Sequence, residues 1–176
     1  CLRLTLDSNV AIGHSRWATH GEVSLENTHP IHDENVALVH NGIIENFRDI
    51  KDWLLNLGYQ FKSQTDTEVA FHLVRYYLNK GLSMFATITK VMEVIAGNFA
   101  LCILHKNYPD NIFCAKRGSP LMVAEHIDNK FIASDVNTLS LFKEDYYPLE
   151  DNDIAIISKA TPIRIWNNGI QKRVTV

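Results

Sequence analysis

A nine-residue stretch near the N-terminus gathers residue types that bind ligands and transfer protons. It reads Gly13-His14-Ser15-Arg16-Trp17-Ala18-Thr19-His20-Gly21. The guanidinium of Arg16 offers a planar set of N–H donors that suits a carboxylate, and Thr19 and His20 can add hydrogen bonds. Because the stretch is too polar for a core strand, we expect a binding loop. A surface loop with an arginine salt bridge is the alternative.

A second stretch, His40-Asn41-Gly42-Ile43-Ile44-Glu45-Asn46, places an Asn-Gly pair after an apolar run at 36–39. Asn-Gly is typical of a tight hairpin turn, but here a helical spacing begins directly afterwards. At such a junction the Asn41 amide and the Gly42 backbone N–H can both donate to one developing oxyanion. A hairpin turn and an oxyanion site are therefore both open.

A third stretch, Ser63-Gln64-Thr65-Asp66-Thr67-Glu68, precedes a second helical pattern. Asp66 is either the N-cap of that helix or an exposed carboxylate presented to a ligand amine, and capping is the commoner case.

Metal and thiol chemistry receive less support from the sequence. The histidines at 14, 20, 29, 32 and 40 show no ligand spacing, and no CxxC or HExxH motif accompanies them, so we expect no metal and no cofactor. Cys102 and Cys114 lie in apolar runs that disfavour a thiolate, and they are typical of reduced core cysteines. A metal-dependent hydrolase is the weakest hypothesis.

Composition limits the protein class. The chain has 176 residues, 46% of them hydrophobic, and a formal net charge of -3, which is typical of one globular domain without the basic footprint of a nucleic-acid or membrane binder. No apolar run approaches the roughly 20 residues needed to span a bilayer. We expect a cytoplasmic protein with no nucleic-acid and no membrane partner.

The elements that must position these residues follow from hydrophobic spacing. Helical spacing predicts helices over 45–57, 67–79 and 84–95, with Gly58, Gly81 and Gly97 as stops. Short apolar runs between turn residues predict strands, and a short helix is expected at 136–142. The predicted strands cover 10–12, 36–39, 99–104, 111–115, 121–124, 131–133, 154–157 and 163–166. Consecutive helices flanked by strands indicate an α+β fold.

The three polar stretches together resemble a known family. With Arg117-Gly118-Ser119-Pro120-Leu121 and Phe131-Ile132-Ala133-Ser134-Asp135, they are similar in order and spacing to the glutaminase domain of glutamine:fructose-6-phosphate amidotransferases, or glucosamine-6-phosphate synthases. The resemblance covers essentially the whole chain. Phosphoribosyl-pyrophosphate amidotransferase and asparagine synthetase share the plan, but the Arg-Trp-Ala-Thr-His-Gly run favours the hexosamine enzymes.

The resemblance implies a fold, a reaction and residue roles. The fold is that of an N-terminal-nucleophile hydrolase, an αββα four-layer sandwich; the reaction releases ammonia from glutamine for an isomerase domain in amino-sugar synthesis. By motif position, Arg16, Thr19 and His20 hold the α-carboxylate end of glutamine, Trp17 belongs to the ammonia gate, Asn41 and Gly42 form the oxyanion hole, and Asp66 binds the α-amino group. Asp66→Ala is then expected to abolish glutamine binding and to leave the fold nearly intact.

The chain departs from this pattern at its start. The family nucleophile is an N-terminal Cys, usually followed by Gly-Ile or Gly-Val, whereas Cys1 is followed by Leu2 and Arg3 and lies twelve residues before Gly13. We expect residues 1–176 to be a partial glutaminase domain that lacks its leading segment and contains no isomerase domain. The alternative is a non-catalytic glutamine-binding or partner-binding fragment; exposed sheet edges then favour self-association, and a homo-oligomer is possible.

Overall fold

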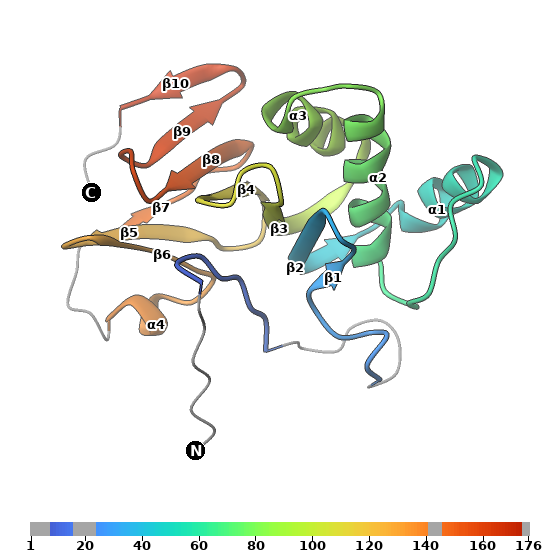
Figure 1. Cartoon of the computed structure of the whole chain (residues 1–176), viewed down its shortest axis with the longest axis horizontal. Coiled ribbons are helices and arrows are strands. Elements are labelled where there is room, and N and C mark those ends of the chain that lie inside the picture. The colour runs from blue at the N-terminus through green and yellow to red at the C-terminus, as the bar shows by residue number, and fades with distance from the viewer. Residues whose placement is uncertain (1–7, 16–23, 141–145, 174–176) are drawn as a thin grey trace.

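Two antiparallel sheets lie face to face in the computed structural model, which describes residues 8–15, 24–140 and 146–173 (Figure 1). The larger sheet has seven strands in the order β1-β2-β3-β4-β8-β9-β10, and the smaller has three in the order β6-β5-β7. All paired strands run antiparallel. The strands are β1 (Ile31–His32), β2 (Val36–Ile44), β3 (Gly97–His105), β4 (Asn111–Arg117), β5 (Met122–His126), β6 (Asn129–Ala133), β7 (Tyr146–Pro148), β8 (Asp153–Ser158), β9 (Arg164–Asn167) and β10 (Ile170–Lys172).

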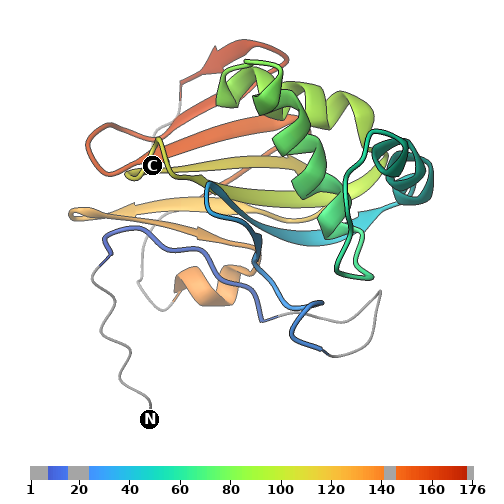
Figure 2. The same cartoon turned by 45° about the vertical axis from the view of Figure 1, so that its right-hand side comes forward.

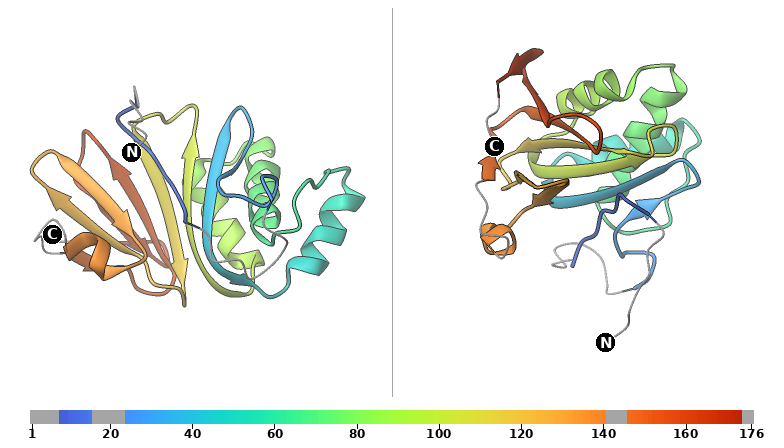
Figure 3. Two further views of the ribbon diagram at one scale, coloured as in Figure 1. Left: turned by 90° about the horizontal axis from the view of Figure 1, so that it is seen from below. Right: turned by 60° about the vertical axis from the view of Figure 1, so that its left-hand side comes forward.

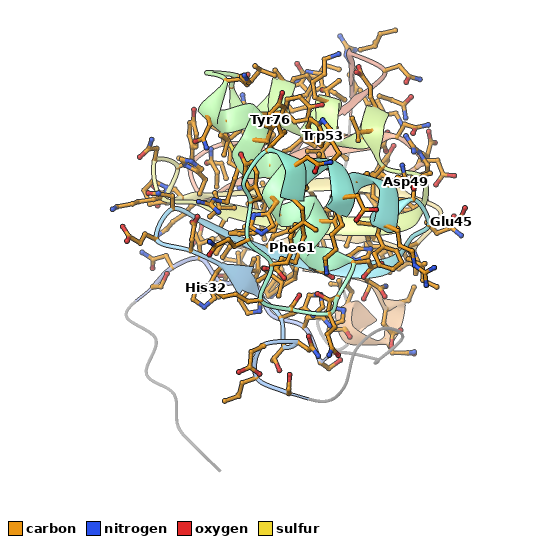
Figure 4. The ribbon with its side chains drawn as sticks, turned by 90° about the vertical axis from the view of Figure 1, so that its right-hand side faces the viewer. His32, Glu45, Asp49, Trp53, Phe61 and Tyr76 are labelled. Carbon is orange, nitrogen blue, oxygen red and sulfur yellow. The ribbon has the colours of Figure 1, made fainter. Side chains whose placement is uncertain are left out.

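Three helices cover the outer face of the seven-stranded sheet: α1 (Phe47–Asn56), α2 (Thr67–Asn79) and α3 (Met84–Val94). The sequence predicted all three, and α2 has the predicted bounds. The backbone N–H of Ala86 donates to the Ser83 side chain at the start of α3 (3.3 Å), as expected for an N-cap. Trp53 on α1 contacts Tyr76 on α2 edge-on, with ring centroids 4.9 Å apart (Figure 4). This contact joins α1 to the rest of the helical layer.

A short fourth helix, α4 (Val136–Ser140), covers the outer face of the three-stranded sheet. The order of layers is therefore helix, sheet, sheet, helix, which Figure 2 and the right-hand view of Figure 3 show edge-on. This confirms the predicted α+β class and the αββα sandwich, with α4 as the described part of the outermost layer. The β6 and β7 strands are the two edges of the smaller sheet among the described residues.

Side chains alternate between the two faces of each strand, and the buried ones form three separate hydrophobic cores. On β3, Phe99, Leu101 and Ile103 face the helices, whereas Ala100 and Cys102 face the smaller sheet. Side chains also alternate between the two faces of β5. Met122 and Ala124 pack toward α4, whereas Val123 packs toward the larger sheet. A strand buried on both faces reads as a continuous apolar run, and the sequence shows such a run at Phe99–Leu104.

One predicted strand is wrong. Residues 10–12 have no strand partner among the described residues, although Val10 and Ile12 are apolar. Ile12 instead packs against the core between the two sheets. Burial of the side chain thus explains the apolar pattern without strand pairing.

Candidate active site

A cavity of about 540 Å³ lies between the two sheets. Its larger-sheet wall carries Val39 and Asn41 from β2 and Ala100 and Cys102 from β3. The opposite wall comes from β6 and the residues after it, and a third wall is the N-terminal segment Ala11–Ser15. The lining combines apolar side chains with polar ones, so the cavity can both bury and orient a small polar molecule. The remaining lining residues are Ile112, Leu121, Lys130, Phe131, Ile132, Ala133, Ser134, Asp135 and Thr138.

The Asn41-Gly42 pair lies inside β2, which corrects both the expected hairpin turn and the expected strand–helix junction. Asn41 is paired with Ala100 of β3 and Gly42 with Phe99. The strand continues to Ile44 before α1 begins. Continuous pairing with β3 therefore overrides the local turn preference of Asn-Gly.

Gly42 has a backbone conformation that other residues adopt with strain. Its φ is +131°, and a Cβ built on it would lie 2.1 Å from the carbonyl oxygen of Asn98 and 2.7 Å from Oγ of Ser119. The first of these neighbours is backbone and has no side-chain rotation with which to move away. Glycine is thus required here for two independent reasons, the positive φ and the close approach. The backbone beside Asn41 is fixed at the cavity wall.

Asp66 stands at the N-cap position of α2, but its carboxylate neither caps the helix nor is exposed. Its side chain makes no cap hydrogen bond to α2 and is buried, with 4% of the residue exposed. Oδ2 accepts a hydrogen bond from the backbone N–H of Ile44 (2.8 Å), and Oδ1 lies 3.8 Å from Nδ1 of His40. Asp66 is not among the residues that line the cavity. It approaches the end of β2 just beyond Gly42.

Thr67 links two histidines beside Asp66. Its Oγ1 lies 2.9 Å from Nε2 of His29 and 3.1 Å from Nδ1 of His40. A hydroxyl donates one hydrogen bond and accepts others, so it can serve one imidazole as donor and the other as acceptor. The His29 ring in turn lies 4.7 Å from the ring of His14, which lines the cavity. The network connects the start of α2 to the cavity wall.

Glu68 holds the loop that carries Asp66. Its carboxylate accepts hydrogen bonds from the backbone N–H groups of Lys62 (2.9 Å) and Ser63 (2.6 Å) and lies 3.5 Å from Nε2 of His72. Burial by itself raises the pKa of the Glu68 carboxyl, but the hydrogen bonds from His72, Lys62 and Ser63 outweigh it and lower the pKa to about 2. Phe61, which is labelled in Figure 4, lies at the start of this loop. It packs edge-on against His72. Glu68 is therefore ionised at neutral pH and fixes the path of the chain into Asp66.

Asn46 anchors the other end of the same region. Its Nδ2 donates to the carbonyl oxygen of Val94 (2.9 Å), and its Oδ1 accepts from the backbone N–H of Ala96 (2.8 Å). The amide therefore joins the segment after β2 to the end of α3. The polar stretches contain Asn46 and Thr67, but the partners of these two residues are too distant along the chain for the stretches to reveal their roles.

The structure brings together part of the predicted site. Asn41 lines the cavity, Gly42 is its neighbour, and Asp66 contacts the same strand. Arg16, Trp17, Thr19 and His20 lie outside the described residues, as does Cys1. Among the described residues, no group of three or more His, Cys, Asp or Glu is placed to hold a metal ion. Of the helices within 8–15, 24–140 and 146–173, none has the length and apolar character needed to cross a membrane.

Comparison with known families decides the relationship. The model of the glutamine amidotransferase domain family matches residues 14–140, a range that contains Asn41, Gly42 and Asp66. The chain belongs to the glutamine amidotransferase domain family. This confirms the resemblance that the polar stretches indicated.

Relatives of this glutamine amidotransferase domain are bacterial enzymes named glutamine–fructose-6-phosphate aminotransferase (isomerizing). The one from Francisella tularensis is 40% identical over 168 residues, which are 96% of this chain and 28% of the relative. That from Mesorhizobium japonicum is 44% identical, over 88% of this chain and 25% of the relative. The chain thus spans about a quarter of the length of these relatives.

Two solved structures share the fold. The glutamine phosphoribosylpyrophosphate amidotransferase of B. subtilis matches 88% of this chain and 34% of its own chain, with a TM-score of 0.74 at 24% identity. A second structure, described as the allosteric regulatory enzyme of purine biosynthesis, matches with a TM-score of 0.70 at 23% identity. The likeness confirms the predicted fold with its αββα layers.

Proposed function

We propose that this domain hydrolyses the side-chain amide of glutamine to glutamate and ammonia, and that a longer parent protein uses the ammonia to make glucosamine 6-phosphate from fructose 6-phosphate. The observation that carries the proposal is the position of Asn41 on the wall of a cavity, with Gly42 next to it on β2, in a glutamine amidotransferase domain. The names of the relatives supply the acceptor.

The proposed oxyanion hole consists of the Asn41 side-chain amide and the Gly42 backbone N–H. Attack on the glutamine amide carbon places negative charge on its oxygen, and two fixed donors stabilise that charge without reorganisation. The surroundings of Gly42 support this role, because the Asn98 carbonyl and Oγ of Ser119 lie where a Cβ would stand and leave the backbone little room to move before the substrate arrives.

The proposed glutamine-binding groups are Arg16, Thr19 and His20 at the α-carboxylate, Trp17 at the ammonia gate, and Asp66 at the α-amino group. For Asp66, the support is that Oδ2 is occupied by Ile44 whereas Oδ1 lies beyond hydrogen-bond distance of His40. A carboxylate oxygen held in this way can accept a hydrogen bond from an ammonium group. The segment 16–20 continues directly from Gly13, His14 and Ser15, which line the cavity.

The nucleophile is the group that this proposal leaves outside the described residues. The family pattern requires a thiol at an N-terminus, whose free α-amino group acts as base. Burial raises the pKa of Cys114 well above that of a free thiol, which disfavours Cys114 in this role. The Cys1→Ala variant tests whether Cys1 has this role.

Localisation, partners and domain limits are parts of the same proposal. We propose that the protein is cytoplasmic and that its substrate is glutamine. Its partner is the isomerase domain of the parent chain, and its assembly is a homo-oligomer. Residues 1–176 form a partial glutaminase domain. The alternative, a glutamine-binding or partner-binding module without a nucleophile, has the same cavity but no turnover.

The test is the release of glutamate from L-glutamine by the 176-residue chain, beside Asn41→Ala and Cys1→Ala. Removing one oxyanion donor typically lowers kcat by about 10²–10³-fold. We expect that loss in Asn41→Ala with little change in KM. Loss of activity in Cys1→Ala identifies the nucleophile. Glutamine binding without glutamate release contradicts the proposal for this chain and favours the non-catalytic alternative.

A further inference from the structure

Two cysteines face each other across neighbouring strands beside the cavity. Cys102 of β3 and Cys114 of β4 are direct cross-strand partners, and both are free thiols. The Cys114 thiol donates to Sγ of Cys102 across 3.5 Å. Directly opposed residues of antiparallel strands have Cα atoms about 4.5–5.5 Å apart, within the range of about 4.4–6.8 Å that a disulfide spans. A disulfide here requires side-chain rotation and little backbone movement.

The two thiols differ in their access to the cavity. Cys102 lines it and retains 8% exposure, whereas Cys114 is fully buried and does not line it. Burial also raises the pKa of the Cys114 thiol, so its thiolate is disfavoured. A small reagent entering the cavity therefore meets Cys102 first, with Cys114 directly behind it.

We propose that Cys102 and Cys114 form a modification site, a dithiol that a hydroperoxide entering the cavity oxidises to a cross-strand disulfide. The Cys102 sulfur attacks the peroxide and gives up its proton: an S–O bond forms, the O–O bond breaks, and the leaving oxygen takes that proton. The product is a sulfenic acid. The Cys114 sulfur then attacks the Cys102 sulfur, the S–S bond forms, and the hydroxyl leaves as water with the Cys114 proton. Two thiols lose two electrons and the peroxide is reduced.

This site shares the cavity with the proposed oxyanion hole. Cys102 is paired with Val39 of β2, and the next inward-facing pair along the two strands is Ala100 with Asn41. All four residues line the cavity. The disulfide reaction itself does not depend on the proposed glutaminase activity, so it can be tested without a turnover assay.

The experiment treats the 176-residue chain, carrying Cys1→Ser so that only Cys102 and Cys114 remain, with hydrogen peroxide, and measures the intact mass after blocking of free thiols. We expect a monomer about 2 Da lighter that takes up no blocking reagent and recovers both thiols on reduction. A product that carries only sulfinic acids, or disulfide-linked dimers, overturns the proposal.

Single variants and a trapping reagent test the order of the two steps. In Cys114→Ala, dimedone is expected to trap a sulfenic acid on Cys102; in Cys102→Ala, Cys114 is expected to stay reduced. In the two-cysteine chain, the dimedone adduct should map to the peptide that contains Cys102, which gives a result even where a variant fails to fold. Equal labelling of both cysteines in the folded chain, as in the urea-unfolded control, contradicts the proposal.

Discussion

The carboxylate of Asp66 accepts a hydrogen bond from the backbone N–H of Ile44, with Oδ2 and N 2.8 Å apart. The two residues are 22 positions apart in the sequence. Ile44 is the last residue of β2 and Asp66 precedes α2, so this bond joins the strand of Asn41 and Gly42 to the helical layer. A buried carboxylate thus has a structural task beside its proposed role toward a ligand amine.

Substitutions at Asp66 should separate these two tasks. Asp66→Ala removes the acceptor and leaves the Ile44 N–H buried and unpaired, which costs about 1–3 kcal/mol in the free energy of unfolding. The hydrogen bond to Ile44 therefore predicts a measurable loss of stability, where the sequence alone led us to expect a nearly intact fold. Asp66→Asn keeps an acceptor oxygen and should lose less than half as much. Denaturant unfolding measures both values, and equal losses would show that charge rather than hydrogen bonding matters here.

Gly42→Ala should be far more destabilising than Gly58→Ala. Both glycines have positive φ, at +131° and +87°, but a Cβ at Gly58 meets nothing within 4 Å. The control therefore carries only the cost of the backbone conformation, about 1–3 kcal/mol. Gly42→Ala adds displacement of the Asn98 carbonyl and should also abolish glutamine hydrolysis. Similar melting temperatures for the two variants would disprove the close approach.

Glu68 should make the stability of the protein depend on acidic pH. Its pKa is lowered from 4.5 to about 2 in the folded protein, so its contribution is complete above the unfolded pKa and is lost as pH falls from about 4.5 toward 2. The shift corresponds to at most about 3 kcal/mol. We expect wild type to exceed Glu68→Gln in stability at neutral pH and the two to converge in acid. A stability gap that does not change with pH contradicts this assignment.

Thr67→Val should weaken the link between the two histidines. The valine has nearly the same shape but no hydroxyl for Nε2 of His29 or Nδ1 of His40. We expect a loss of about 1–3 kcal/mol in unfolding free energy and reduced glutamate release. Thr67→Ser keeps the hydroxyl and should retain most of both. If valine and serine behave alike, the network does not contribute.

The helices were predictable from the sequence because their signals are local. Apolar spacing and a terminal glycine define α1 and α2, and a serine cap begins α3. The short strands β1, β7 and β10 have two or three residues each, too few to show a period. Their formation depends on pairing with distant strands, and a local pattern contains no information about that pairing.

The candidate site was predictable only in part, for the same reason. The types of Asn41, Gly42 and Asp66 indicated donors and an acceptor for a zwitterionic amide substrate. Their backbone conformation and contacts could not be predicted from residue type. Pairing with β3 keeps β2 extended through Gly42, and the Asp66 carboxylate accepts from the Ile44 N–H instead of capping α2. The opposition of Cys102 and Cys114 likewise depends on the register of β3 with β4.

The most direct test of the proposed glutamine site is a calorimetric titration of L-glutamine into wild type, Asp66→Asn and Asn41→Ala, beside an analogue of glutamine that lacks the α-amino group. A hydrogen bond to a charged group contributes about 1.5–3 kcal/mol, so Asp66→Asn should weaken glutamine binding about 10-fold or more. Wild type and Asp66→Asn should bind the analogue equally, and Asn41→Ala should still bind glutamine. Unchanged glutamine affinity in Asp66→Asn would contradict the account.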